Sequence, residues 1–209
     1  MIQIKNVYLV RHGQTSWNLE KRTQGGKDSD LTALGIRQAE SLRKKFQKIK
    51  LDSIYTSPLK RAYTTAQMVA KDQNLNCILD DRLVEMNFGD WEGLTHEEIK
   101  KFYPEEFKTW RMEPHMAVIP NGETISVVQE RMVAFLNDII IQSNDDNILV
   151  VSHSATIKLL LLHILSMNLN HYYNLQQDNC AINLVTFKPY GPVLVKYNDI
   201  CHMDIMMER

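Results

Sequence analysis

Two histidines each follow a short apolar run that has the composition of a buried strand. His12 follows the run 6–11, and His153 follows the run 147–152. A third run of this kind, 53–56, leads into a predicted helix. Ligands of open α/β sheets bind beyond the carboxyl ends of the strands, so we expect both imidazoles to point into one site.

Two arginines are expected at the same carboxyl ends of the strands. Arg11 directly precedes His12, and Arg61 lies in the first turn of the helix that follows the third run. The planar guanidinium matches phosphate oxygens in a bidentate manner, and helix N-termini add backbone N–H donors. A neutral imidazole is an adequate nucleophile when its other ring nitrogen is held as a donor. These residue types indicate an anionic substrate, with phosphate as the best candidate.

Five ordered blocks of sequence carry a resemblance that covers most of the chain. They are Arg11–Asn18, which continues through Gln24 and Gly25 to Leu31–Gly35, then Thr56–Ala66, Glu85–Gly93, Pro120–Thr124 and Val151–His153. Together they resemble the histidine phosphatase superfamily, also called the phosphoglycerate mutase-like family. The third block also looks like that of the small broad-specificity phosphatases, including those of the α-ribazole phosphatase type.

The resemblance implies a role for each of five catalytic residues. His12 attacks phosphorus and becomes a phosphohistidine, while Arg11, Arg61 and His153 stabilise the charge of the transferring phosphoryl group. We expect His153 to be protonated for this task. Glu85 protonates the leaving oxygen and then deprotonates the attacking water. These positive groups supply the charge that magnesium supplies elsewhere, so the resemblance implies neither a metal nor another cofactor.

The resemblance also implies a phosphate- and substrate-binding set. It consists of Asn18, Gln24, Gly25 and the backbone N–H of Ser154. The chain departs from the family's usual pattern at four positions, which are Asp30 for proline, Asn121 for glycine, Ser154 for glycine and Lys158 for arginine. The serine matters most, because a Cβ close to the phosphate could slow the reaction or redirect its specificity.

The function expected from the resemblance is hydrolysis of a small phosphorylated metabolite through the phosphohistidine. A phosphoglycerate mutase-type phosphoryl transferase is the first alternative. The mutases are longer and carry a larger insertion, whereas here only 68 positions separate Glu85 from His153. A non-catalytic regulator that binds a phospho-ligand is the second alternative, against which the presence of all five catalytic residues weighs.

The alternation of strand and helix patterns predicts one α/β domain over residues 1–209, a three-layer sandwich whose mostly parallel sheet has helices on both faces. Expected helices span 33–48, 59–72, 95–109, 125–142 and 155–166. Expected strands span 6–11, 53–56, 76–79, 147–152, 180–187 and 193–197. The segment 86–123 departs from the alternation, and we interpret it as a small inserted lid. Its apolar residues are candidates for the wall around the leaving group, namely Phe88, Trp91, Phe102, Tyr103, Phe107, Trp110, Met112 and Met116.

Charge and composition argue against several other classes of protein. The 24 basic and 25 acidic side chains give no general attraction for nucleic acid, and six basic residues on or just after the helix 33–48 fit its solvated face. The remaining histidines show no metal-ligand spacing. The N-terminus lacks a signal-peptide layout, the run 159–162 is too short to span a membrane, and three isolated cysteines favour reduced thiols. We therefore expect a cytoplasmic protein, with a homodimer left open.

Overall fold

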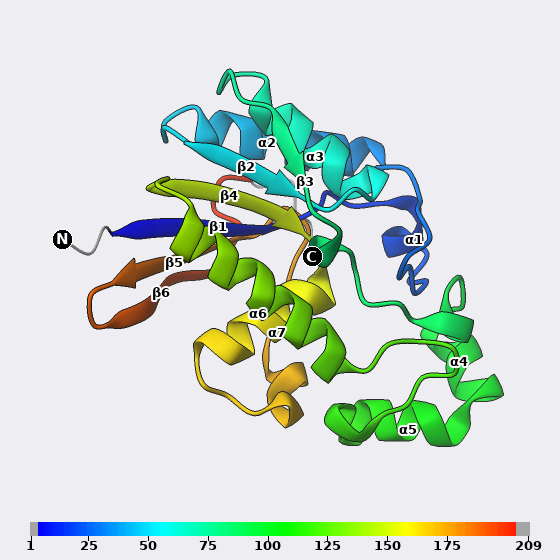
Figure 1. Ribbon diagram of the computed structural model, residues 1–209. Helices are drawn as coiled ribbons and strands as arrows, with labels where there is room; N and C mark the ends of the chain where they lie inside the picture. The colour runs from blue at the N-terminus through cyan, green and yellow to red at the C-terminus, as the bar shows by residue number, and fades with distance from the viewer. Residues whose placement is uncertain (1–3, 204–209) are drawn as a thin grey trace.

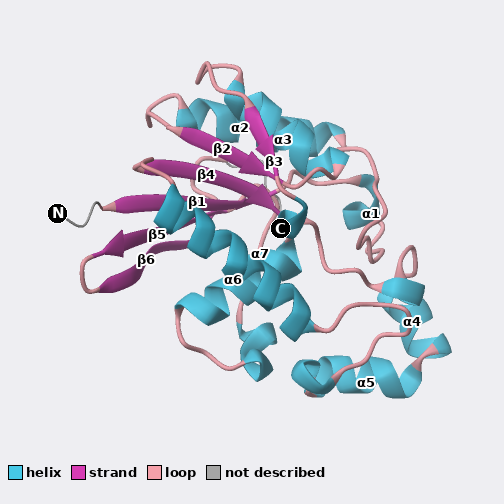
Figure 2. Cartoon of the chain, in the orientation of Figure 1, coloured by secondary structure: helices cyan, strands magenta, loops and turns pink. Residues whose placement is uncertain are grey.

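Six strands form one sheet in the order β3-β2-β4-β1-β5-β6 in the computed structural model, which describes residues 4–203 (Figures 1 and 2). They are β1 (Lys5–Arg11), β2 (Ser53–Thr56), β3 (Cys77–Leu79), β4 (Asn147–Ser152), β5 (Ile182–Lys188) and β6 (Gly191–Asp199). The first four strands run parallel, and β5 and β6 pair antiparallel at one edge. The expectation of a mostly parallel sheet is confirmed.

Helices cover both faces of this sheet (Figure 1). They are α1 (Ser16–Leu19), α2 (Ala33–Phe46), α3 (Lys60–Ala70), α4 (His96–Phe102), α5 (Pro104–Met112), α6 (Ile125–Gln142) and α7 (Ser154–Ile164). Short 3₁₀ turns lie at Asp81–Leu83, Gly89–Trp91, Pro114–Met116 and Leu169–Asn174. Helices α2 and α3 pack on one face, and α6 and α7 pack on the other.

The burial of β1 explains why its sequence is apolar without alternation. Tyr8 and Val10 pack into the core that α2 and α3 cover. Val7 and Leu9 point the opposite way, into the core under α6 and α7. A strand buried on both faces needs apolar side chains at successive positions, whereas a half-buried strand alternates. The predicted three-layer arrangement is confirmed.

Two local features differ from the expected elements. The single helix expected over 95–109 is wrong, because the chain breaks between α4 and α5 at Tyr103, which has φ −134° and ψ 57°. Pro104 follows, and proline disfavours the helical conformation in the residue before it. The short helix α1 was not predicted. Its start is closed by a capping box, in which the backbone N–H of Asn18 donates to the Thr15 hydroxyl and that of Thr15 to the Asn18 side chain.

The inserted segment packs against the core through part of its apolar set. Trp91, Ile99 and Trp110 are buried together with residues of α6 and α7. Of the eight expected wall residues, four line a cavity of about 400 Å³, namely Phe88, Trp91, Phe107 and Trp110. Tyr103 packs beside the same cluster. Phe102, Met112 and Met116 are exposed and contribute nothing to the wall, because they lie on the outer side of short helices and turns.

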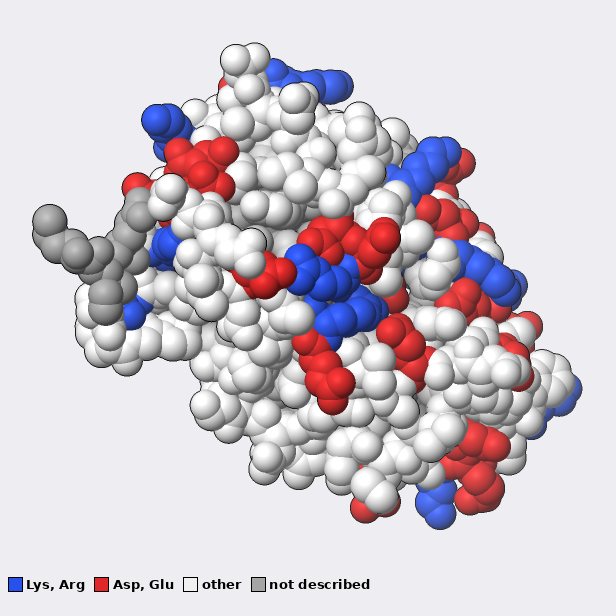
Figure 3. Space-filling view, viewed as in Figure 1, with Lys and Arg blue, Asp and Glu red and all other residues white. Residues whose placement is uncertain are grey.

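The surface carries both signs of charge side by side over the face shown in Figure 3. Arg82, for example, pairs with both Asp80 and Asp138. On α2 the apolar residues are buried and basic residues such as Lys44 are exposed, as the helical spacing predicts. Within residues 4–203 no helix has the length and apolar character needed to cross a membrane.

Candidate active site

Parallel neighbours β1, β2 and β4 bring the two histidines to one edge of the sheet. The backbone N–H of His12 donates to the Ser152 carbonyl at 3.0 Å, and that of Ser57 donates to the Val151 carbonyl at 3.0 Å. The ring centroids of His12 and His153 are 5.2 Å apart. Residues that lie 141 positions apart in the chain therefore share one site.

His12 is held in a single tautomer. Its Nδ1 lies 2.7 Å from the Gly13 carbonyl oxygen, and a carbonyl can only accept, so Nδ1 carries the proton. This leaves a lone pair on Nε2. Burial lowers the pKa of His12 well below 6.5, and the nearby charges of Arg11 and Arg61 lower it further. The imidazole is therefore neutral at neutral pH, as a nucleophile must be.

His153 is also neutral, which corrects the expectation that it is protonated. Burial lowers its pKa well below 6.5, with further contributions from Arg61, His12 and Arg11. Its Nε2 hydrogen-bonds with the Ser57 hydroxyl at 2.9 Å. The Ser57 hydroxyl also accepts from the Leu59 backbone N–H, and its second lone pair and its proton allow it either to accept from Nε2 or to donate to it. The other ring nitrogen of His153, Nδ1, is buried and has no hydrogen-bond partner in the protein.

Arg61 is fully buried and is fixed by the loop between α1 and α2. Its Nη1 donates to the Lys27 carbonyl and to the Asp28 carboxylate, each at 2.8 Å. Its Nη2 donates to the Gly25 carbonyl at 2.8 Å. The buried Nε is left without a partner in the protein. The side chain is thus oriented before any ligand binds, which reduces the entropic cost of binding.

Arg11 completes the cationic group around the nucleophile. Its Nη1 donates to the Gln177 carbonyl at 2.6 Å, and its Nε has no partner in the protein. Burial lowers the pKa of Arg11, while Glu85 and Asp178 raise it. A guanidinium retains its charge under such a shift. Three buried nitrogen atoms without partners, one each on Arg11, Arg61 and His153, therefore belong to this site.

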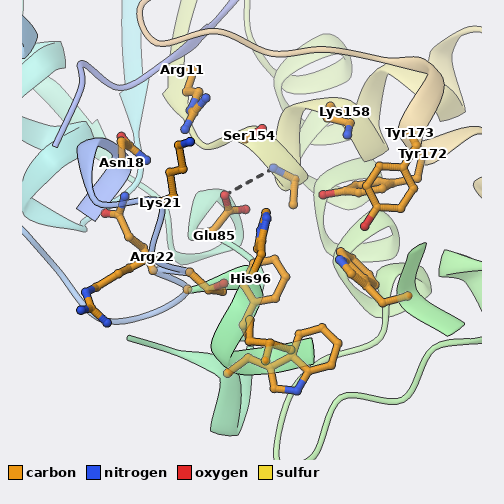
Figure 4. Close-up of a pocket in the computed structure, with 18 of the residues that line it drawn as sticks. Arg11, Asn18, Lys21, Arg22, Glu85, His96, Ser154, Lys158, Tyr172 and Tyr173 are labelled. Atoms are coloured by element: carbon orange, nitrogen blue, oxygen red, sulfur yellow. Dashed lines mark hydrogen bonds between the residues drawn. The ribbon is translucent and has the colours of Figure 1, made fainter. Parts of the chain in front are cut away.

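Glu85 is oriented by the start of α7. Its Oε1 accepts from the Thr156 hydroxyl at 2.9 Å and from the backbone N–H groups of Met86 and Thr156. Its Oε2 accepts only from the Ala155 N–H, at 3.3 Å (Figure 4). Oε2 is thus the oxygen with capacity left for a proton or a water molecule.

Eight of the nine expected site residues line a cavity of about 400 Å³. They are Arg11, His12, Asn18, Gln24, Gly25, Arg61, Glu85 and Ser154. His153 is not among the lining residues, because it is fully buried beside His12. Eight further polar and aromatic residues line the cavity but were not expected, namely Lys21, Arg22, Thr23, His96, Arg111, Lys158, Tyr172 and Tyr173. Figure 4 labels all of them except Thr23 and Arg111. Only Lys158 had a sequence signal, as a departure from the family pattern.

Two of the expected binding side chains are held by other side chains of the site. The Asn18 oxygen accepts from the Thr15 N–H and from the Asn179 side chain at 3.1 Å each. Gln24 donates to the Thr15 hydroxyl at 2.8 Å. The Asn18 oxygen is thereby occupied, which leaves the amide N–H₂ group of Asn18 as the part suited to an anion.

No group of three or more histidine, cysteine, aspartate or glutamate side chains that could hold a metal ion occurs in the described part of the chain.

Residues 7–200 match the family model described as histidine phosphatase superfamily (branch 1). The chain belongs to this superfamily. As a histidine phosphatase superfamily member it aligns with its relatives over nearly all of its length.

Three relatives illustrate the range of activities within the superfamily. Phosphoserine phosphatase 1 of Hydrogenobacter thermophilus is 34% identical over 93% of this chain and 92% of its own. A probable phosphoglycerate mutase of Yersinia pestis is 33% identical over 95% of each chain. The structure of an α-ribazole phosphatase from Shigella flexneri has a TM-score of 0.86 and 28% identity, covering 93% of this chain and 96% of that one. Because the Yersinia protein has matching length, chain length does not separate phosphatases from mutases here.

Proposed function

We propose that this chain is a phosphomonoester hydrolase that acts through a phosphohistidine on His12. The observation that carries the proposal is the hydrogen bond from His12 Nδ1 to the Gly13 carbonyl, which directs the lone pair of a neutral ring to Nε2. Arg11 and Arg61 lie close enough to lower the pKa of this ring. A nucleophile without a proton beside two fixed guanidinium groups suits attack on an anionic phosphorus centre.

In the first step His12 Nε2 attacks phosphorus, so that an N–P bond forms while the P–O ester bond breaks. The protonated Glu85 carboxyl gives its proton to the departing oxygen. Arg11, Arg61 and the Nδ1–H of His153 donate to the phosphoryl oxygens. An arriving phosphate also favours the charged form of His153, which opposes the pKa depression caused by the arginines.

In the second step water attacks the phosphohistidine as Glu85 takes one of its protons. The N–P bond breaks, inorganic phosphate leaves, and His12 and the protonated Glu85 are restored. Each step needs positioned charges and proton transfer but no metal ion. We include in this proposal the binding roles of Asn18, Gln24, Gly25 and Ser154, which line the same cavity.

The test is phosphate release from a panel of phosphomonoesters in EDTA, for the unaltered protein and for His12→Ala. We expect release by the unaltered protein and its loss in the variant, together with an acid-labile phosphoprotein after rapid quenching. Activity of His12→Ala equal to that of the unaltered protein would overturn the proposal. Dependence of the unaltered protein on an added divalent cation would overturn the metal-independent mechanism.

A mutase is the second candidate, because a probable phosphoglycerate mutase is one of the relatives of similar length. Interconversion of 3- and 2-phosphoglycerate, measured beside phosphate release, distinguishes the two. Transfer faster than release would favour the mutase. A phospho-ligand binder would show neither reaction while still binding phosphate.

A cytoplasmic location and a small phosphorylated substrate are part of the same proposal. The three cysteines, Cys77, Cys180 and Cys201, are unpaired, which suits a reducing compartment. Nucleic acid is not expected as a ligand, and homodimer formation stays a prediction. Light scattering of the purified protein measures the oligomeric state directly.

A further inference from the structure

Lys158 is a buried cation that the proposed chemistry does not use. Its side chain lies on α7, one helical turn after Ser154, and lines the cavity with only 7% of the residue exposed. No hydrogen bond or ion pair holds its Nζ among residues 4–203. Buried charges in proteins are almost always paired, because removing an ammonium from water is costly. The charge of Glu85 acts on this lysine without forming an ion pair with it. The N–H donors of Nζ are therefore left for a ligand.

Aromatic rings form the walls around this ammonium. Nζ lies 3.6 Å from the centroid of the Tyr172 ring and 5.4 Å from that of Tyr173. The guanidinium carbon of Arg111 lies 4.5 Å from the centroid of the Tyr173 ring. Cation–π contacts stabilise the charge in part, but they leave its hydrogen-bond donors unused. Figure 4 shows the lysine and both tyrosines on the side of the cavity across from Asn18 and Lys21.

The position of this group relative to Glu85 indicates which part of a substrate it meets. The helix turn that carries Lys158 also supplies Ala155 and Thr156, whose N–H groups bind the Glu85 carboxylate. Glu85 is the group that faces the leaving oxygen in the proposed reaction. A second group on the leaving fragment, a few bonds beyond the ester oxygen, therefore reaches the lysine.

We propose that Lys158, flanked by Tyr172, Tyr173 and Arg111, binds a carboxylate on the leaving group, so that the substrate is a phosphomonoester of a small hydroxy- or amino-carboxylic acid. This inference rests on the proposed phosphatase function. A carboxylate would place a negative charge in direct contact with the ammonium and would offer acceptors for its three N–H donors. Arg111 is exposed at the cavity mouth and offers a further donor to the same group.

The ionisation of the lysine gives the subsite a pH signature. Burial lowers its pKa to about 8, with Arg11 and Arg111 lowering it and Glu85 raising it. The titratable and charged groups near its amine are thus Glu85, Arg11, Arg111 and the two tyrosines. The amine is protonated at neutral pH and loses its charge above about pH 8. Binding of a carboxylate should weaken over that range, whereas binding of an ester without one should not depend on this group.

The experiment compares O-phosphoserine with O-phosphoethanolamine, which has the same phosphate ester and amine but no carboxylate. We expect the unaltered protein to prefer phosphoserine, and Lys158→Met to lower the ratio of the two kcat/KM values about 10- to 100-fold, as for a lost charge-assisted hydrogen bond. Lys158→Arg keeps the charge and should retain most of the preference. Lys44→Met removes an exposed lysine of α2 and controls for net charge.

The inference is overturned if the unaltered protein has the same kcat/KM for both esters, or if the ratio of the two kcat/KM values does not change in Lys158→Met. Phosphate release in either case would still support the phosphatase proposal. An equal fall of this ratio in Lys44→Met would show that net charge causes the effect, which also overturns the inference. If Lys158→Met does not fold, the KM for phosphoserine in the unaltered protein decides, and a KM that stays constant from pH 7 to about pH 9 contradicts the subsite. If no ester is hydrolysed, the phosphatase proposal fails, and calorimetry with the two esters tests the subsite by itself, since equal or absent binding rejects it.

Discussion

The Glu92 carboxylate accepts a hydrogen bond from the backbone N–H of Gly26 at 2.8 Å, and so joins the inserted segment to the loop that holds Arg61. The same carboxylate accepts from the N–H groups of Lys27 and Phe88. The loop carbonyls of Gly25 and Lys27 accept from Arg61. Glu92 thereby helps to set the position of Arg61, the group for which we propose a role in phosphate binding.

Replacement of Glu92 should therefore affect catalysis more than folding. We expect Glu92→Ala to lower kcat/KM about 10- to 100-fold, because a misplacement of about 1 Å in a catalytic group can cost this much. Glu92→Gln keeps one oxygen acceptor and should lose less. Glu97→Ala, at an exposed position of the same segment, is the matched control. The idea fails if steady-state kinetics show Glu92→Ala and Glu97→Ala to be alike.

Both the backbone conformation and the surroundings of Gly25 disfavour a Cβ at this position. Its φ of +57° is left-handed, and an added Cβ would lie 1.9 Å from Glu92 Oε1. We expect Gly25→Ala to reduce the free energy of unfolding by about 1–3 kcal/mol and to reduce activity, since the strained loop releases Arg61.

Gly26→Ala is the matched control for this change. Its Cβ would come no closer than 3.8 Å to Glu92 Oε1, which is an ordinary contact. Chemical denaturation of the two variants measures the difference. Equal stability losses at the two glycines would contradict the close approach described for Gly25.

The two buried histidines predict a loss of stability in acid. Their folded-state pKa values lie well below 6.5, so the unfolded chain takes up protons first as the pH falls. Stability is therefore fully present above about pH 6.5 and declines below it, by up to about 1.4 kcal/mol per pH unit for each histidine.

Denaturation curves from pH 5 to 8 test this dependence. The double variant His12→Gln with His153→Gln should show a flatter pH profile than the unaltered protein. Inorganic phosphate should oppose the decline, because it stabilises a charged His153. Parallel profiles for the two proteins would exclude these side chains as the source.

Ser154 is the fourth test, because it is the first residue of α7 and lines the cavity where the family usually has glycine. We expect Ser154→Gly to raise kcat or alter the ranking of substrates, since it removes a Cβ beside the proposed phosphate site. Stability should fall by at most about 1 kcal/mol, the cost of glycine in a helix. Kinetic constants unchanged for every substrate would show that the serine has no influence on the reaction.

The amino-acid sequence by itself determined the sheet, the order of most elements and the family. Local patterns suffice for this, because burial on both faces makes β1 continuously apolar and helical spacing predicts α6 with the bounds that the structure shows, 125–142. Pro104 is also a sequence signal for the break between α4 and α5, although the expected helix 95–109 ran through it. Motifs alone predicted four residues that line the cavity, namely His12, Arg61, Glu85 and Ser154.

Only the tertiary structure decided how these groups are charged and held. The pKa of His153 is lowered first by burial and then by Arg61, His12 and Arg11 around it, an environment that no single stretch of sequence contains. The tyrosines around Lys158 come from a 3₁₀ turn after α7, and the Glu92 contact crosses more than sixty positions. Electrostatic fields and buried contacts depend on distance in space, so they appear only when the chain is folded.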